Sequence, residues 1–423
     1  MNKSKSATII GAGVIGAFTA YYLLEKGWSV TIIDKERFGQ GSSKGNCGLI
    51  VPNHILPLNN PGRLLKAILG MLKADAPLHV KPQFNINLIK WFINFARQCN
   101  QKDILTSAEG RHALLQSSFK LYPAVIDNEK ISCDWTTGGS LHAFQSAKQW
   151  AAYKATDALL RNYGIAAEQI NREAILALEP ALGDDLVGGW HYRNTAHLRP
   201  EKLLQEIHRI LSEKGARIIE NEEITRFATK NDRVSGVRIK DEMISADDFV
   251  VATGAWTPMF EKTLGCRIPI QPGKGYSVTM KRPQNCLGRP VFFEEKNVVA
   301  TPWQGYFRLG GTMEFTGYDS SLSPKRLDAL TRAAACYFRD FKAEDIEEEW
   351  SGFRPMTYDG LPIIDRSPRL KNVMIAAGHN MTGLSMGPGT GKLVAEMLNN
   401  ELPHVDPQPY GAGRFGSPSG IRR

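Results

Sequence analysis

The residues best suited to chemistry lie near the start of the chain, where glycines recur at the spacing of a dinucleotide-binding turn. Gly11, Gly13 and Gly16 follow a β-rich run, and an apolar helical pattern leads to a second strand that ends at Asp34. The glycines allow a tight turn, close approach of a pyrophosphate and close helix packing. The helix N-terminus offers N–H groups to phosphate, and Asp34 can accept hydrogen bonds from a ribose. This order predicts dinucleotide binding, with a glycine-rich turn in an unrelated βαβ unit as the alternative.

A second cluster of small and polar residues follows that strand and favours FAD over NAD. Its members are Ser42, Ser43, Gly45, Asn46 and Gly48, which can offer N–H and hydroxyl groups. FAD is long and extended, so its pyrophosphate and flavin end need a second loop of this kind. An ordinary surface loop is the alternative interpretation.

A third motif, WSGFRPMTYDGLPIID at 350–365, places an arginine in a constrained setting. Arg354 lies between Gly352 and Pro355, ahead of a turn at Asp359 and Gly360. A fixed guanidinium recognises a carboxylate with two parallel hydrogen bonds. We therefore expect Arg354 to bind a carboxylate; a solvated surface arginine is the alternative.

Two more strand ends carry flexible backbone. VVATGAW at 250–256 would bring Gly254 next to a bound cofactor, because ligands bind where parallel strands end. The segment 376–396 repeats the order of strand, glycine turn and helix, and its helix N-terminus would stabilise negative charge on a reduced flavin. His379 either lies beside the flavin or caps the turn structurally.

The elements that must position these residues belong to a chain of globular composition. With 423 residues, 42% apolar and 22% charged, two domains are expected. Six cysteines without C-x-x-C spacing, and no H-E-x-x-H, argue against a disulfide framework or a metal site. No signal peptide is visible, and no apolar run reaches the roughly 18 residues of a spanning helix. The sequence predicts a cytoplasmic protein, soluble or peripheral at the inner face of the cell membrane.

The net charge of +9 has two interpretations, a solvated basic surface or attraction to an anionic membrane. Nucleic acid is not expected as a partner, because no long basic run or binding motif occurs. Two amphipathic segments, 63–74 and 86–97, are either half-buried helices or an interfacial patch, the second carrying Trp91, Phe92 and Phe95 beside Lys90 and Arg97.

The pattern of elements predicts an α/β fold in which a Rossmann-like FAD-binding domain is interleaved with an antiparallel-sheet (α+β) substrate domain. We expect further helices at 108–130, 146–163, 168–180, 200–214 and 324–340. Strand signals lie at 216–230, 233–240, 247–256, 275–281, 291–294, 297–301 and 306–310. The predicted FAD-binding domain comprises 1–56, 190–265 and 345–402, the substrate domain comprises 57–189 and 266–344, and 403–423 form a flexible tail.

In these motifs the chain resembles the FAD-dependent D-amino-acid oxidase superfamily, which includes glycine oxidase and sarcosine oxidase. It is most similar to the small-subunit type of bacterial D-amino-acid dehydrogenase. The segments that carry the resemblance follow family order: GAGVIG with Asp34, SSKGNCGLIVP, TGAW, PGKGYSV, GGTMEF, GFRPMTYDGLPII and AAGHNMTGLSMGPGTGKLVAEML.

The resemblance implies FAD as cofactor and assigns roles to matching positions. The predicted cofactor-binding residues are Gly11, Gly13, Val14, Ile15, Gly16, Asp34, Lys35, Ser42, Ser43, Gly45, Asn46, Gly48, Leu49, Ile224, Gly254, Trp256, Gly352, Gly378, Asn380, Met381, Thr382, Gly383, Leu384 and Ser385. The predicted catalytic residues are Arg354, Tyr276 and His379. Tyr276 is a candidate second substrate contact or an ordinary sheet tyrosine.

The resemblance also implies oxidative deamination of a D-amino or D-imino acid by hydride transfer to flavin N5. Asn46-Cys47 and Asn380-Met381 depart from the dehydrogenase pattern, and the first loop is closer to members that act on D-proline or hydroxyproline. Cys47 is either a small packed residue or a covalent or redox link to the flavin. The electron acceptor is a quinone or oxygen, and the oligomeric state is left open. Alternatives are an amine oxidase of the glycine or sarcosine type and a flavin-bearing subunit without its own activity.

Overall fold

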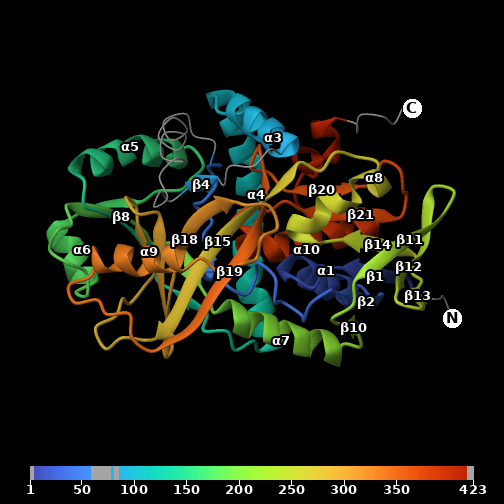
Figure 1. Ribbon diagram of the computed structural model, residues 1–423, viewed down its shortest axis with the longest axis horizontal. Coiled ribbons are helices and arrows are strands. Elements are labelled where there is room, and N and C mark those ends of the chain that lie inside the picture. The colour runs from blue at the N-terminus through green and yellow to red at the C-terminus, as the bar shows by residue number, and fades with distance from the viewer. Residues whose placement is uncertain (1–3, 59–77, 81–84, 417–423) are drawn as a thin grey trace.

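The computed structural model describes residues 4–58, 78–80 and 85–416, which build two main sheets. Figure 1 shows a parallel sheet at one end of the long axis and a large, mostly antiparallel sheet at the other. This arrangement confirms the expected α/β fold with a second, mostly antiparallel sheet.

The parallel sheet carries the glycine-rich turn. In spatial order it consists of β10 (Arg217–Ile219), β2 (Ser29–Ile33), β1 (Ser6–Ile10), β14 (Asp248–Val251), β21 (Val373–Ala377) and the antiparallel β20 (Ile363–Arg366). The chain passes from β1 to β2 on one side and returns through β14 on the other. The carboxyl end of β1 therefore lies at a topological switch point, where open α/β sheets bind their ligands.

Two helices, α1 (Val14–Glu25) and α10 (Gly383–Leu398), pack together behind this sheet. A Cβ on Gly387 would lie 2.9 Å from the ring of Phe18, and one on Gly391 would overlap the backbone of the same residue. Gly389 faces Ser118 of α4 (Gln101–Glu129) in the same way. The glycines inside α10 thus let three helices approach closely, and they belong to the helix rather than to the turn before it.

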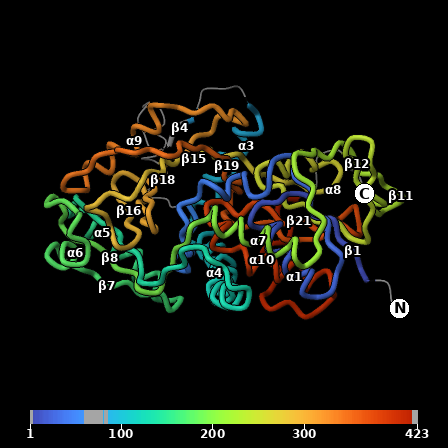
Figure 2. Tube along the Cα trace, turned by 90° about the horizontal axis from the view of Figure 1, so that it is seen from below, coloured from blue at the N-terminus to red at the C-terminus, as the bar shows by residue number. Residues whose placement is uncertain are grey.

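The large sheet lies beside the parallel one. Its order is β19 (Ile346–Thr357), β15 (Ile270–Lys281), β18 (Tyr306–Phe315), β17 (Val298–Trp303), β16 (Val291–Phe293), β6 (Ser140–Phe144), β8 (Gly188–Tyr192) and β7 (Glu168–Asn171), with β4 (Leu78–Val80) beside β18. Helix α9 (Pro324–Ala335) covers one face, and in Figure 2 it lies on the opposite side of the molecule from α4.

Side chains of β15 alternate between the two faces of the large sheet. Tyr276, Val278 and Met280 join the apolar cluster under α9. Gly275 and Ser277 face the other way, as strand geometry requires. The face away from α9, here called the polar face, carries Ser277 and Thr279, and Cys47 packs against it.

The remaining elements surround these two sheets. They are α3 (Ile86–Arg97), α5 (Ala147–Arg161), α6 (Arg172–Leu178), α7 (Pro200–Glu213), α8 (Glu261–Leu264), the 3-10 turns η1 (Gly254–Phe260), η2 (Gln408–Tyr410) and η3 (Ala412–Phe415), and the strands β3 (Leu49–Ile50), β5 (Thr136–Thr137), β9 (Ala196–His197), β11 (Ile224–Lys230), β12 (Arg233–Ile239) and β13 (Glu242–Ile244). Within the described residues, no helix is long and apolar enough to span a bilayer.

Several predicted elements need correction. The helix expected at 168–180 is a strand, β7, followed by the short α6, because Asn171 caps a new helix by accepting the N–H of Ala174 at 3.0 Å. Strand β19 was not predicted, since its acidic start resembles a solvated loop. The expected helix at 63–74 lies outside the described residues.

The tail expected to be flexible from residue 403 is packed as far as residue 416. Tyr410 is fully buried and donates to the carbonyl of Gly110 at 2.7 Å, while Arg414 forms an ion pair with Asp359 at 2.7 Å. The division into domains stays a prediction. The boundary predicted at 189/190 falls inside β8, and β19 was expected in the FAD-binding part, whereas both strands hydrogen-bond within the large sheet.

Close packing of α1 against α10 predicts that Gly391→Ala destabilises the protein. The added methyl would overlap the backbone of Phe18, and overpacking of this kind costs about 1–3 kcal/mol. Gly413→Ala is the control, because no atom of the described residues lies within 4 Å of its Cβ position. Thermal unfolding should show a lower Tm for the first variant alone; equal Tm values would contradict the packing argument.

Candidate active site

The N-terminus of α1 is arranged to receive a phosphate. Gly11 has a φ of +107°, and a Cβ on either Gly11 or Gly16 would overlap backbone atoms, so both positions require glycine. Gly13 caps the helix without a side-chain hydrogen bond, and the first turn holds no acidic residue. The hydroxyl of Ser43 accepts the N–H of Val14 at 3.1 Å, which brings the second loop onto the helix end. Free N–H groups and the helix dipole favour an anion here.

Asp34 stands at the end of β2, as the motif predicts. Its two carboxylate oxygens accept the N–H groups of Ala12 at 2.6 Å and Glu36 at 2.9 Å. Burial raises the pKa of Asp34, and these two hydrogen bonds act against that rise by favouring the charged form. Each oxygen keeps acceptor capacity for a ribose hydroxyl. The first residue of β11, Ile224, follows a segment whose Glu222 N–H bonds to the Asp34 carbonyl at 2.9 Å.

The loop 42–48 connects the parallel sheet to the polar face of the large sheet. A Cβ on Gly45 would overlap the ring of Trp350, and a Cβ on Gly48 would overlap the carbonyl of Leu198. The side chain of Asn46 accepts the N–H of Gly48 at 2.8 Å. The loop therefore has no room for larger residues at its two glycines.

Arg308, which the sequence did not indicate, anchors this loop. Its fully buried guanidinium donates to the carbonyls of Lys44 at 3.0 Å and Asn46 at 2.8 Å, and it also pairs with Glu201 and with Glu348. These partners lie in the loop, in helix α7 and in strand β19, so no local sequence signal could have shown this role.

Arg354 lies on β19 with its guanidinium over Gly275 of β15, where a Cβ would overlap it. It donates to the carbonyls of Thr312 at 2.7 Å and Gly311 at 3.3 Å. Among the residues that the structure describes, no carboxylate pairs with it. Burial lowers the pKa of Arg354 from its ordinary value, yet the group remains charged at neutral pH. A buried guanidinium in this setting can receive the two oxygens of a carboxylate through parallel hydrogen bonds.

A bulge in β18 shapes this position. Thr312 has a φ of +56°, and the pairing of β15 with β18 shifts by one residue beside it. Positive φ is rare for a β-branched residue, and glycine usually occupies such a bulge. The bulge turns the Thr312 carbonyl towards Arg354. Gly275 and Thr312 are functional candidates that sequence reasoning missed, because strand register decides both.

The turn between β21 and α10 joins the same region. Asn380, with a φ of +54°, accepts the N–H of Thr357 at 3.0 Å and donates to its hydroxyl at 3.0 Å. Ser385 donates to the carbonyl of Leu49 at 2.7 Å, which ties α10 to β3. The other predicted residues of this turn are Gly378, Met381, Thr382, Gly383 and Leu384, of which Met381 is the most exposed. Thr357 follows Arg354 on β19, so Asn380 couples the arginine strand to the start of α10.

Two predicted catalytic residues lie away from Arg354. Tyr276 points under α9 and donates to Glu314 at 2.7 Å, which in turn pairs with Arg326 at 2.7 Å. Burial raises the pKa of this tyrosine well above its ordinary value. Because it occupies the opposite face of the sheet from Gly275, the structure does not bring it to the arginine.

His379 is buried beneath α10 and shares a hydrogen bond with the hydroxyl of Thr390 at 3.0 Å. Burial lowers its pKa to about 3, so the imidazole is neutral at physiological pH. This placement favours the structural interpretation of His379 over a catalytic one.

The Trp256 side of the site links the two sheets. The Nζ atom of Lys35 lies 3.9 Å from the centroid of the Trp256 ring, which also packs edge-on against Phe353 of β19. Gly254, with a φ of +55°, has no atom within 4 Å of its Cβ position. Val14, Ile15, Leu49 and Gly352 complete the set: the first two lie in the first turn of α1, the third in β3, and Gly352 lies against Trp350.

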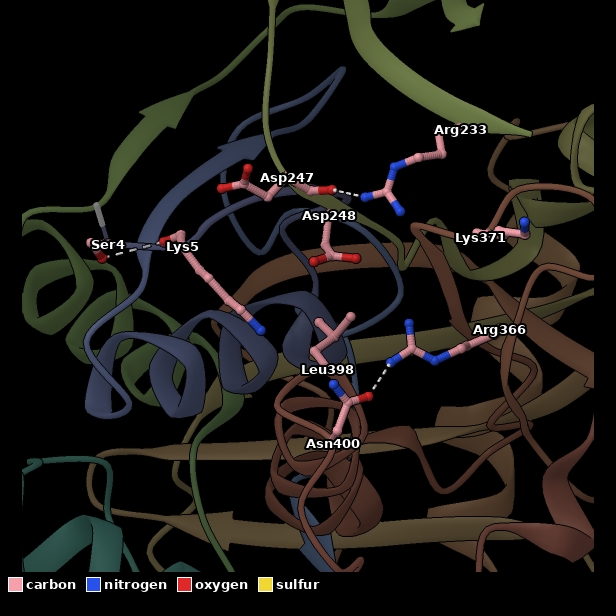
Figure 3. A pocket seen from close by; sticks show the side chains of 9 residues that line it. All are labelled: Ser4, Lys5, Arg233, Asp247, Asp248, Arg366, Lys371, Leu398 and Asn400. Atoms are coloured by element: carbon pink, nitrogen blue, oxygen red, sulfur yellow. Dashed lines mark hydrogen bonds between the residues drawn. The ribbon is translucent and has the colours of Figure 1, made fainter. Parts of the chain in front are cut away.

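A cavity of about 530 Å³ lies elsewhere, at the opposite edge of the parallel sheet (Figure 3). Its lining residues lie before or at the start of β1, β12, β14 and β21, at the end of β20, and at or just after the end of α10: Ser4, Lys5, Arg233, Asp247, Asp248, Arg366, Lys371, Leu398 and Asn400. Arg366 donates to the carbonyl of Met397 at 2.6 Å and Lys371 pairs with Asp232 at 2.5 Å. These contacts hold the last turn of α10 and the loop before β21 in place. The cavity lies at the opposite end of the strands from the glycine turn.

Comparison with known proteins identifies the family. The DAO family of FAD-dependent oxidoreductases matches residues 6–397. The chain belongs to this family. It is 30% identical over 414 residues to a D-amino acid dehydrogenase of Granulibacter bethesdensis, covering 96% of this chain and 99% of that protein. It is 29% identical over 413 residues to D-amino acid dehydrogenase 1 of Mesorhizobium japonicum, covering 96% and 99% respectively.

The fold is likewise similar to that of a solved family member. Glycine oxidase from Geobacillus kaustophilus superimposes with a TM-score of 0.78 at 21% identity, covering 97% of this chain and 99% of that chain. The expected family, fold and FAD dependence are thus confirmed.

The residues present fit FAD. The start of α1 with Gly13 and Ser43 suits the pyrophosphate, and Asp34 keeps acceptor capacity for the ribose. On the polar face of the large sheet, the buried hydroxyl of Ser277 has no hydrogen-bond partner among the described residues. An unpartnered buried hydroxyl beside the loop 42–48 is consistent with a ligand there.

The low pKa of His379 predicts a contribution to acid sensitivity. An unfolded histidine takes up a proton below about pH 6.5, whereas folded His379 stays neutral until about pH 3. The free energy of unfolding therefore decreases as the pH is lowered from about 6.5 to about 3. The slope is at most about 1.4 kcal/mol per pH unit. In denaturant unfolding at several pH values, His379→Gln should have a shallower acid slope than the parent.

Thr390→Val is the matched control, because it removes the hydrogen-bond partner and keeps the buried imidazole. It should keep the parental slope. Identical slopes for the parent and His379→Gln would show that His379 is protonated in the folded protein.

Proposed function

We propose that the protein is a D-amino-acid dehydrogenase, an FAD-dependent enzyme that oxidises a D-amino or D-imino acid such as D-alanine, D-proline or hydroxyproline. The observation that carries the proposal is the buried guanidinium of Arg354, which lacks a carboxylate among the described residues. Support also comes from two relatives named D-amino acid dehydrogenase that align along nearly the whole chain.

The chain's residues would mainly bind and orient the substrate. FAD, when bound, supplies the hydride acceptor. Arg354 would hold the substrate carboxylate, and the carbonyls of Gly311 and Thr312 would fix the guanidinium so that the Cα–H has one orientation. Positioning of this kind accounts for up to roughly 7–11 kcal/mol of a barrier. Tyr276 and His379 lie elsewhere and would not act as acid or base. If the substrate amine arrives neutral, hydride transfer requires no acid–base residue.

The electrons would pass to a quinone or another acceptor. Helix α3 buries Leu88 and Trp91 in the molecule, whereas Ile86, Ile89 and Ile93 remain about half exposed. Such an exposed apolar row beside basic residues supports peripheral contact with the inner face of the cell membrane, where a quinone is available. An oxygen-using oxidase of the glycine or sarcosine type is the second candidate, favoured by the structural similarity to a glycine oxidase.

The test of the proposal is anaerobic reduction of the purified holoprotein. D- and L-amino acids, D-hydroxyproline, glycine and sarcosine are added separately, and loss of the visible flavin absorbance is followed. Bleaching by one D-amino or D-imino acid is expected. Bleaching by sarcosine or glycine alone, with peroxide formed in step with turnover, would favour the oxidase; no bleaching at all would favour a flavin-bearing subunit.

Removal of the guanidinium should damage substrate use and spare the cofactor. Arg354→Ala is expected to raise KM and to lower kcat/KM at least about a hundredfold, since a charged hydrogen-bonded pair contributes several kcal/mol. Arg354→Lys should recover only part of this, because an ammonium lacks the bidentate fork. Flavin content measured by absorbance serves as the control. Near-normal kinetics in Arg354→Ala would refute the assignment.

A further inference from the structure

The residue at the bulge, Thr312, contacts the arginine through its carbonyl and carries a hydroxyl group without a partner among the described residues. The Oγ1 atom of Thr312 is buried and has no hydrogen-bond partner among the described residues. Its own carbonyl accepts a hydrogen bond from Arg354 Nη1 at 2.7 Å. Most buried hydroxyls have a partner, so an orphan on a residue that contacts a buried cation is consistent with a polar ligand at this position.

The surrounding strands do not supply that group. Pairing of β17 with β18 ends at Gly311, and pairing of β4 begins at Met313. On the other side, β15 pairs with Gly311 and Glu314 and skips Thr312. The backbone at this residue is therefore outside all three described ladders.

The residue type makes the position more informative. Glycine would adopt a φ of +56° without strain, whereas a β-branched residue is a genuine outlier there. Strained residues persist where the side chain has a use, and the hydroxyl is what Thr312 adds. The opposite residue, Gly275, leaves the space that the guanidinium occupies.

We propose that Thr312 is a second substrate contact, whose hydroxyl donates a hydrogen bond to the carboxylate held by Arg354. The proposal rests on the proposed function and names the contact that Tyr276 cannot make from the other face of the sheet. Because the Thr312 carbonyl already contacts the guanidinium, the hydroxyl of the same residue would be able to reach an anion bound to the other N–H groups of Arg354. Together, Arg354 and Thr312 would then bind the carboxylate from two directions.

The test uses holoprotein and propionate, which keeps the carboxylate of D-alanine and lacks its amine. Binding is followed through the change in the flavin spectrum. Thr312→Val keeps the shape and the backbone strain and removes only the hydroxyl. It should weaken propionate binding about tenfold or more, and Thr312→Ser, which keeps the hydroxyl, should bind within about threefold of the parent.

Thr312→Gly separates the hydroxyl from the strain. It should bind propionate as weakly as Thr312→Val, or more weakly, while its Tm is higher than that of Thr312→Val because glycine accepts the positive φ. If Thr312→Val does not fold, propionate binding by Thr312→Gly alone tests the proposal. Ethylamine, which keeps an amine and lacks a carboxylate, should not distinguish the variants.

Propionate binding in Thr312→Val or Thr312→Gly within about twofold of the parent would overturn the proposal. Failure of the function has a different signature: no amino or imino acid bleaches the flavin of the parent protein. Weakened propionate binding together with absent bleaching would retain the carboxylate contact and reject the proposed reaction.

Discussion

The site depends on one constraint: Arg354 is a buried positive charge that no carboxylate among the described residues pairs with. Transfer of a guanidinium out of water is costly, and the two backbone carbonyls that meet Arg354 compensate only part of that cost. A missing side chain at Gly275 and a strained bulge at Thr312 maintain the arrangement. The structure thus bears local costs that a bound carboxylate would offset, as is usual for a recognition site.

The cofactor region and the arginine are held together by a few cross-links. Arg308 fixes the loop 42–48 from the large sheet, and Asn380 joins the end of β19 to the turn before α10. Ser385 of α10 provides a third link by donating a hydrogen bond to the carbonyl of Leu49 in β3. Since each link spans two different sheets or layers, movement of one part would displace the other. These cross-links would therefore fix the position of the substrate carboxylate relative to the flavin.

The parts of the site that sequence could predict are those with local causes. The turn at Gly11, Gly13 and Gly16 and the acid at Asp34 follow from strand, helix and phosphate geometry within one βαβ unit. Arg354 could be singled out because its motif constrains the backbone. Tyr276 could not be placed, because one residue of strand register decides which face it occupies.

Other features depend on contacts between distant segments. Gly310 and Gly311 hint at an irregular strand, but the sequence does not indicate that the bulged residue with positive φ is Thr312 rather than a glycine. The glycines of α10 resemble a second ligand-binding turn in sequence, yet they serve helix packing against Phe18. Arg308 resembles any strand arginine until the loop 42–48 is placed over it.

The most direct test of this account is a crystal structure of the FAD-loaded protein with a small carboxylate ligand. We expect both carboxylate oxygens to lie about 2.7–2.9 Å from the guanidinium nitrogens of Arg354, on the polar face of the large sheet. A ligand bound elsewhere, with Arg354 contacting only the carbonyls of β18, would contradict the central claim.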